Sequence, residues 1–158
     1  VGNIAKATVE AMQKAYHTDP ADLIAAIGPS ICQDCYEVSE DVIEEFRQAY
    51  PETLHKKLFY RKPNGKYQLN LWEACHQNFL TSGICEENIL TPNLCTCCNP
   101  DFLYSHRASH ANEETSQPSW DYDKERTIYI QKHCVRSNNH YYNGKLSCYT
   151  VFLYINII

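Results

Sequence analysis

The chain has 158 residues, of which 44% are hydrophobic, and a formal net charge of −5. That length fits one domain with a real core, and the composition is that of a globular protein rather than a disordered one. The acidic balance and the lack of clustered Lys and Arg argue against nucleic acid as the main partner. Because no apolar run reaches the roughly 18 residues of a membrane helix, no membrane partner is expected either.

The first predicted element is a helix near the N-terminus. Five residues recur there at the spacing of one helical face: Ile4, Thr8, Ala11, Met12 and Ala15. Asp19-Pro20 ends this helix. The apolar run Leu23 to Ile27 is typical of a central strand buried on both faces. Gly28-Pro29 then stops the strand and begins a turn that carries two cysteines.

Two further helices are predicted in the middle of the chain. Ser39 caps the first through its hydroxyl, and Pro51 ends it. Its expected buried stripe is Val42, Ile43, Phe46 and Tyr50. Asn70 begins the second helix, with Glu73 three residues later as in a capping box, and Gly83 ends it.

Short strands, turns and a tail complete the prediction. Pro63-Asn64-Gly65 is a turn signal within the polar residues 52–66 and favours a small hairpin. Residues 89–91 and 102–105 are expected to form short strands. Residues 111–126 have the composition of a linker, and Asn143-Gly144 predicts a hairpin in the tyrosine-rich residues that follow.

Nine cysteines are present, and most of those in the first 110 residues lie in two turns, as Cys32-x-x-Cys35 and Cys95-x-Cys97-Cys98. We expect these two turns to lie close together. Thiolate pairs at short spacing suit a tetrahedral zinc site, but small buried thiols and a Cys32/Cys35 redox pair are also open. A nucleophilic Cys95 with His106 as its base is a fourth interpretation. Without an export signal, the odd cysteine count favours reduced thiols in a cytoplasmic protein.

Three residues are candidates for substrate binding: Tyr36, His106 and Arg107. The guanidinium of Arg107, expected at a strand end, is able to hold a phosphate or carboxylate bidentately, with an ion pair as the alternative. Tyr36 is either a packed aromatic residue or a ligand contact. His106 is either a base or an ordinary half-buried histidine. No catalytic residue and no metal ligand is assigned.

Four segments occur in the order of a known family: Ile27–Val38, Leu69–Ala74, Cys95–Asp101 and Tyr104–Ala108. Over residues 1–110 the sequence resembles the polyphenol oxidase/laccase-domain family, now described as purine nucleoside phosphorylases. The resemblance implies an α/β fold with a mixed β-sheet covered by helices, incomplete at the N-terminus. It implies a cytoplasmic enzyme that cleaves adenosine or inosine with phosphate, deaminates adenosine and acts on methylthioadenosine. Oxidation of phenols with copper is also ascribed to the family.

The resemblance also implies a catalytic metal, zinc or copper, in the complete family domain. Two histidines and one cysteine hold it, from Val-His-Gly, Ala-Asp-Cys and Ala-His-Ala-Gly-Trp-Arg-Gly motifs. None of these motifs occurs in this sequence. We therefore expect the chain to correspond to the C-terminal portion of the family domain, to bind no metal and to be inactive alone.

Residues 111–158 depart from the family and are interpreted as a divergent tail, such as a truncated gene model or a shifted reading frame produces. The alternative function is a small non-catalytic module in which the cysteine turns hold a structural zinc. Purine nucleoside and phosphate are the expected partners of the complete protein, and no oligomeric state is predicted.

Overall fold

The computed structural model describes residues 3–91, 93–101 and 103–111. Within them the chain forms helices α1 to α5 and strands β1 to β5, with three short 3-10 turns, η1 (Pro20–Asp22), η2 (Gln33–Cys35) and η3 (Glu86–Asn88). The strands make one parallel pair and one antiparallel three-stranded sheet, so the expected α/β fold with mixed sheets is confirmed. The predicted tail and its hairpin lie outside the described residues.

Helix α1 (Ile4–Tyr16) forms where it was predicted, but it buries a different face. Ala5 and Val9 are fully buried and Met12 packs beside them, whereas Ile4 is 54% exposed. The predicted stripe is therefore confirmed at Met12 but wrong at Ile4, Ala11 and Ala15, which are exposed, and the buried face that meets α4 is centred on Ala5 and Val9. Asn3 caps the helix, since its Oδ1 accepts the backbone N–H of Lys6 at 3.0 Å.

Strand β1 (Ala25–Ala26) pairs in parallel with β5 (Ile89–Leu90), with Ala25 opposite Ile89. The Ile27 N–H extends the ladder to the Leu90 carbonyl at 2.8 Å. The strand is shorter than predicted and is not buried on both faces: Leu23, Ala25 and Ile27 are buried, but the residues between them are only half-buried. Because alternate residues of a strand point to opposite faces, this pattern means that one face of β1 packs in the core cluster with α1 and α4 and the other is partly exposed.

The antiparallel sheet has the order β2-β4-β3, from β2 (Glu37–Val38), β3 (Phe59–Arg61) and β4 (Tyr67–Leu69). The predicted hairpin is confirmed: β3 and β4 pair across the turn at residues 62–66, where Gly65 has a φ of 84°. Strand β2 was not predicted, because two residues directly after the cysteine turn are too short a run to show a period.

Helix α2 (Glu40–Ala49) packs Ile43 and Phe46 against this sheet, and its predicted buried stripe is confirmed at those positions and at Tyr50. Ser39 is the N-cap residue as predicted, but it does not cap through its hydroxyl, which donates to the Asp41 carboxylate instead of accepting a backbone N–H. Helix α3 (Glu52–Leu58) forms in the polar stretch before the hairpin, where no helix was expected. Its two apolar residues, the fully buried Leu58 and the partly buried Leu54 four positions earlier, are too few to show a helical period in the sequence.

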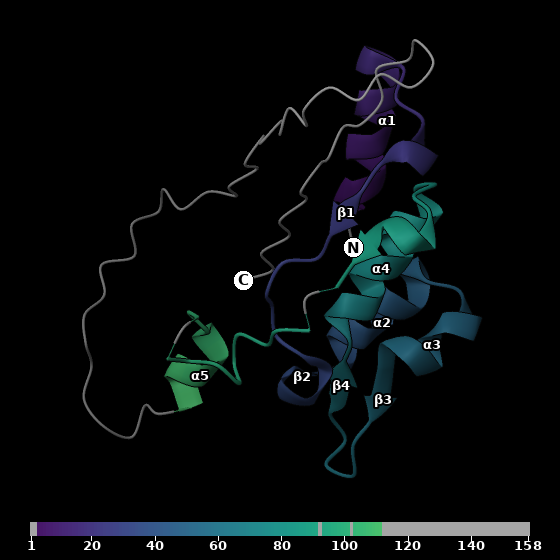
Figure 1. Cartoon of the computed structure of the whole chain (residues 1–158). Helices are drawn as coiled ribbons and strands as arrows, with labels where there is room; N and C mark the ends of the chain where they lie inside the picture. The colour runs from purple at the N-terminus through teal and green to yellow at the C-terminus, as the bar shows by residue number, and fades with distance from the viewer. Residues whose placement is uncertain (1–2, 92, 102, 112–158) are drawn as a thin grey trace.

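Helix α4 (Leu71–Thr81) lies between the two core clusters of the described residues (Figure 1). Cys75 and Phe79 belong to the cluster with α1 and β1, while Leu71 and Ala74 belong to the cluster with α2 and the antiparallel sheet. The predicted start is confirmed, because Asn70 Oδ1 accepts the Glu73 N–H at 3.0 Å. One helix therefore joins both halves of the core.

The strand predicted at residues 102–105 is wrong for its described part, 103–105, and helix α5 (His106–Ala111) begins directly afterwards. Ser105 starts this helix: its Oγ accepts the Ala108 N–H at 3.3 Å and its carbonyl accepts the Ser109 N–H at 3.0 Å. The serine that looked like the end of a strand thus acts as a helix cap.

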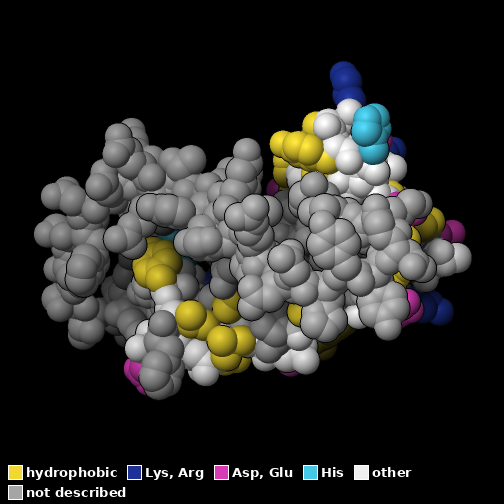
Figure 2. Space-filling view, turned by 45° about the horizontal axis from the view of Figure 1, so that its top comes forward, with side chains coloured by type: hydrophobic (Ala, Val, Ile, Leu, Met, Phe, Trp, Pro, Cys, Tyr) yellow, Lys and Arg dark blue, Asp and Glu magenta, His cyan; other side chains and the backbone are white. Residues whose placement is uncertain are grey.

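Among the described helices, none has the length and hydrophobicity to cross a membrane. On the face shown in Figure 2, the coloured Lys and Arg side chains are separated from one another rather than gathered in a patch. This view of one face does not test the prediction of no nucleic-acid partner, which was made from the charge and composition of the sequence.

Candidate metal centre and the turns around it

The parallel pair of strands brings the two cysteine turns together. Strand β1 leads into the Gly28-Pro29 turn, and β5 leads into the turn at residues 95–98. Beyond the strands, Ser30 and Cys95 form an isolated parallel bridge, and the Thr96 N–H donates to the Ser30 carbonyl at 3.2 Å. The expectation that these turns lie close together is confirmed.

Four thiols converge at this junction. The Sγ atoms of Cys32, Cys35, Cys95 and Cys98 all lie within 4.8 Å of one another, and those of Cys35 and Cys98 are 3.5 Å apart. Cys95 is buried and Cys98 is exposed, with the other two half-buried. Cys97 lies outside the group, so the second turn contributes a Cys-x-x-Cys pair like the first.

Backbone donors make Cys95 the most acidic thiol of the group. Its Sγ accepts the N–H of Cys32 at 3.2 Å and the N–H of Cys98 at 3.4 Å. Burial by itself raises the pKa of Cys95, but these donors outweigh it and lower the pKa to about 7. Burial raises the pKa of Cys35, and the neighbouring thiols raise it further. The two backbone N–H groups therefore favour negative charge on the sulfur of Cys95.

This arrangement is compatible with metal binding, since four thiolates at short distance suit a tetrahedral ion. Among the described residues it is the one group in which three or more metal-ligating side chains converge, and it contains no histidine. It therefore does not fit the pocket of two histidines and one cysteine that the resemblance implies. The expectation that this chain binds no metal stays a prediction.

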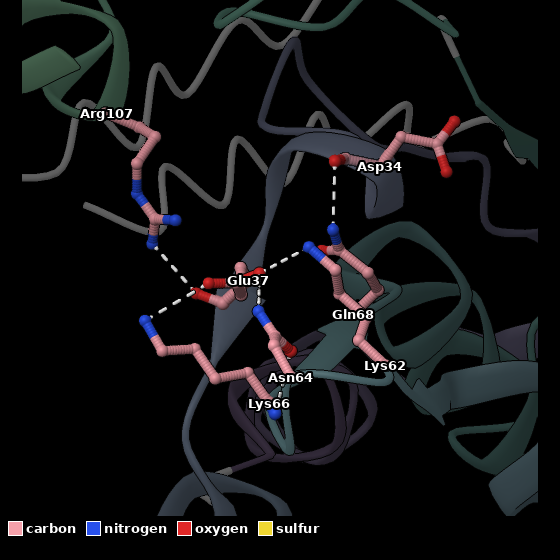
Figure 3. Close-up of polar contacts among 7 residues, drawn as sticks. All are labelled: Asp34, Glu37, Lys62, Asn64, Lys66, Gln68 and Arg107. Carbon is pink, nitrogen blue, oxygen red and sulfur yellow. Dashed lines mark hydrogen bonds and ion pairs between the residues drawn. The ribbon is translucent and has the colours of Figure 1, made fainter.

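The structure brings two of the three predicted substrate-binding residues together. The Arg107 guanidinium lies over the Tyr36 ring, 5.6 Å from its centroid. Arg107 Nη2 also donates to the Glu37 carbonyl at 3.1 Å (Figure 3). Arg107 lies on α5 rather than at a strand end, and its neighbour His106 is the exposed first residue of the same helix. Both Arg107 contacts join α5 to the turn and strand that follow Cys35.

Glu37 is a charged centre that sequence reasoning missed. Its carboxylate pairs with Lys62, with Lys66 at 3.2 Å, and accepts the Asn64 side-chain N–H at 3.3 Å (Figure 3). Hydrogen bonds from Lys62, Lys66 and Asn64, in that order, lower the pKa of Glu37 to about 2. The two lysines that flank the predicted turn were the available signal, but the sequence does not show which carboxylate faces them.

A polar cleft of about 300 Å³ lies beside the first cysteine turn. Its lining residues are Asn70, Trp72, Glu73, His76, Thr91 and Asn93. Trp72 links the cleft to the turn, because its indole N–H donates to Ser30 Oγ at 2.6 Å. Within the described part of the chain, the buried His76 Nδ1 has no hydrogen-bond partner. In the sequence, no ligand spacing around His76 marks it as a functional residue.

Comparison with known proteins places this fold among related chains. Residues 1–115 match the family model described as multi-copper polyphenol oxidoreductase laccase. "Adenosine deaminase RL5" from an unknown prokaryotic organism is 37% identical over 108 residues, which are 68% of this chain and 40% of that protein. "Purine nucleoside phosphorylase YlmD" of Geobacillus stearothermophilus is 34% identical over 107 residues, 67% of this chain and 38% of that protein.

Solved structures with a similar fold are also found. The crystal structure of YlmD from Geobacillus stearothermophilus aligns with a TM-score of 0.60 at 31% identity, over 69% of this chain and 40% of that one. A Bacillus licheniformis hypothetical protein, YfiH, aligns equally well, over 68% and 40%. The chain thus spans about 40% of the length of these relatives.

Proposed function

This chain belongs to the multi-copper polyphenol oxidoreductase laccase family, and on that premise we propose that it forms part of a purine nucleoside phosphorylase. The names of its relatives support phosphorolysis of purine nucleosides and deamination of adenosine. Adenosine and inosine are the proposed substrates, with methylthioadenosine as a further one. Zinc or copper is the proposed catalytic metal of the complete domain, held by groups outside this sequence.

We assign residues 1–110 to the family domain and residues 111–158 to a divergent tail. A cytoplasmic location is also part of the proposal, supported by the seven cysteines that are free of disulfides in the described part of the chain. Nucleoside and phosphate are the proposed partners, without nucleic acid or membrane.

The contact between Tyr36 and Arg107 is the observation that supports a substrate site most directly. Phosphorolysis builds positive charge on the ribose while an anionic phosphate is held beside it. A guanidinium has five N–H donors, and the Glu37 carbonyl engages one nitrogen of Arg107, so donors remain on a side chain that is exposed. Arg107 is proposed to bind phosphate, with Tyr36 and His106 beside it at the nucleoside.

Phosphate-dependent release of hypoxanthine from inosine by the complete protein tests this role. Arg107→Ala should raise the KM for phosphate by about tenfold to a hundredfold, the effect of losing a charge-assisted hydrogen bond. Arg61→Ala is the matched control, because it removes an exposed arginine from β3. Unchanged kinetics for Arg107→Ala would show that Arg107 only fastens α5.

A second assay tests the proposal that this chain is inactive alone. The isolated 158-residue chain should release no hypoxanthine from inosine at any phosphate concentration, since the family's metal-binding motifs are absent from it. Phosphate-dependent release by the chain alone would overturn that statement.

The convergence of four thiols supports the metal component of the alternative function, a small non-catalytic module held by zinc. If the complete protein cleaves nucleosides and this activity depends on Arg107, the chain is not a non-catalytic module. The zinc site itself is independent of that outcome.

A further inference from the structure

We propose that Cys32, Cys35, Cys95 and Cys98 bind one structural Zn²⁺, which fastens the two cysteine turns to each other. This site differs in ligands and position in the sequence from the two-histidine, one-cysteine pocket of the family. It lies where the continuation of β1 meets the continuation of β5.

Distances between the sulfur atoms match a tetrahedral ion. With Zn–S bonds of about 2.3 Å, the sulfur atoms of a tetrahedral site lie about 3.8 Å apart. The observed separations include 3.5 Å for Cys35 and Cys98 and reach at most 4.8 Å for any pair, so small side-chain movements complete the site. A disulfide needs sulfur atoms about 2.05 Å apart and would use two of the four thiols.

The pattern of the ligands supports the same ion. Each turn contributes a Cys-x-x-Cys pair, and the partners across the junction are separated equally in sequence: 63 residues for Cys32 and Cys95, and 63 for Cys35 and Cys98. Two such pairs on facing turns are the arrangement of structural zinc sites. Two backbone N–H groups already point at Cys95 Sγ and stabilise negative charge there.

The site also lies at the attachment of a segment that has no residue in either core cluster. Neither core cluster of the described residues contains a residue beyond Ile89. The contacts that join residues 93–101 and helix α5 to the rest include the Ser30 bridge, the thiol junction and the Arg107 contacts. Because binding of a structural zinc contributes directly to folding, an ion at this junction would hold that segment in place.

One consequence depends on the proposed function. Tyr36 directly follows Cys35, and Arg107 follows the second turn, so the ion would hold both sides of the Tyr36–Arg107 contact. The zinc site itself does not depend on this consequence.

The first experiment uses the unaltered chain, purified under reducing conditions without chelator. Elemental analysis should give one zinc per chain. Alkylation followed by peptide mass spectrometry should show Cys32, Cys35, Cys95 and Cys98 protected together and released together when a chelator removes the zinc. Cys97 is half-buried in the same turn and outside the group, so it should already react while zinc is bound, when the other four thiols are protected.

Replacement of zinc by Co²⁺ supplies an independent signature, since tetrahedral thiolate coordination gives intense visible absorption. Cys32→Ser and Cys95→Ser should each abolish that absorption, and Cys97→Ser should retain it. If the two ligand variants fail to fold, the alkylation pattern of the unaltered chain still decides the matter.

Three results would overturn the proposal. They are a chain without zinc whose four thiols react as fast as Cys97, a Cys35–Cys98 disulfide in freshly reduced and repurified protein, and iron in place of zinc. None of these readouts uses enzymatic activity. A zinc-loaded complete protein that fails to cleave inosine would therefore refute the proposed function and leave the zinc site standing.

Discussion

Two isoleucines allow the same chemical change to be made in opposite environments. Ile43 in α2 is fully buried against the antiparallel sheet, whereas Ile4 at the start of α1 is 54% exposed. Ile43→Val and Ile4→Val each remove one methylene from a helical position, and isoleucine and valine have similar helix propensities. The pair therefore measures burial and tests which face of α1 meets the core.

The structure sets the expected magnitudes. Loss of a methylene from the fully buried Ile43 should lower the free energy of unfolding by about 1 kcal/mol, within the range for Ile→Val in cores. At Ile4 more than half of the side chain already faces solvent, so the loss should stay below about 0.4 kcal/mol. With a urea slope of about 2 kcal/mol per molar, Ile43→Val should lower the midpoint by roughly 0.5 M.

Urea unfolding followed by circular dichroism and tryptophan fluorescence measures both variants. The midpoint for Ile4→Val should lie within about 0.2 M of the unaltered chain. Equal shifts of the urea midpoint for the two variants would mean that Ile4 is buried. The buried face of α1 would then be the one predicted from the sequence, which begins at Ile4, and not the face with Ala5 and Val9. A change in slope for either variant would show altered compactness rather than a local packing loss.

Three further predictions concern a carboxylate, a hydroxyl and a glycine. The folded-state pKa of Glu37 is lowered from 4.5 to about 2, so its ion pairs stabilise the fold above pH 4.5 and are lost as the pH falls toward 2. Glu37→Gln should therefore flatten that part of an acid unfolding curve. An unchanged curve would contradict this prediction. Tyr50→Phe should cost about 1 kcal/mol in urea unfolding, since the buried hydroxyl donates to Asn78 Oδ1 at 3.0 Å; a neutral variant would mean that the bond contributes nothing. Gly83→Ala should destabilise the fold more than Gly65→Ala. Both glycines have positive φ, but only the new Cβ at position 83 would lie 3.0 Å from the ring of Pro20. Equal losses of melting temperature in the two variants would rule out that contact.

The elements predicted correctly are those whose caps, apolar stripe or turn residues lie next to one another in the sequence. Helix α4 has a side-chain cap at Asn70, an apolar stripe and the positive-φ Gly83 at its end, and it was predicted nearly to the residue. The hairpin followed from Pro63-Asn64-Gly65, because a tight turn fixes the pairing of the residues on either side. In both cases neighbouring residues contain the whole of the physical cause.

Elements whose cause lies elsewhere in the chain were missed or misplaced. Helix α3 has only two apolar residues, Leu54 and Leu58, and it packs on α4 and the hairpin strand β3. The buried face of α1 depends on which residues of α4 it meets, and Ala5 is too small to mark that face in the sequence. The pairing of Glu37 with Lys62 likewise depends on the alignment of β2 with β4, which no local pattern shows.

The cysteine junction lies between these two cases. Cys95-x-Cys97-Cys98 contains a Cys-x-x-Cys pair, but the adjacent Cys97 hides it when the spacing is considered alone. Parallel strands end at the same edge of a sheet, and β1 and β5 each lead into one cysteine pair, so their pairing is enough to make the pairs meet. Because the pairing places Ala25 opposite Ile89 and the cysteine partners are 63 residues apart, the two pairs are nearly in register with the strands. The pairing of β1 with β5 therefore accounts for the meeting of the two turns, whereas the convergence of the Sγ atoms in the structure is what identifies Cys98, rather than Cys97, as the fourth thiol.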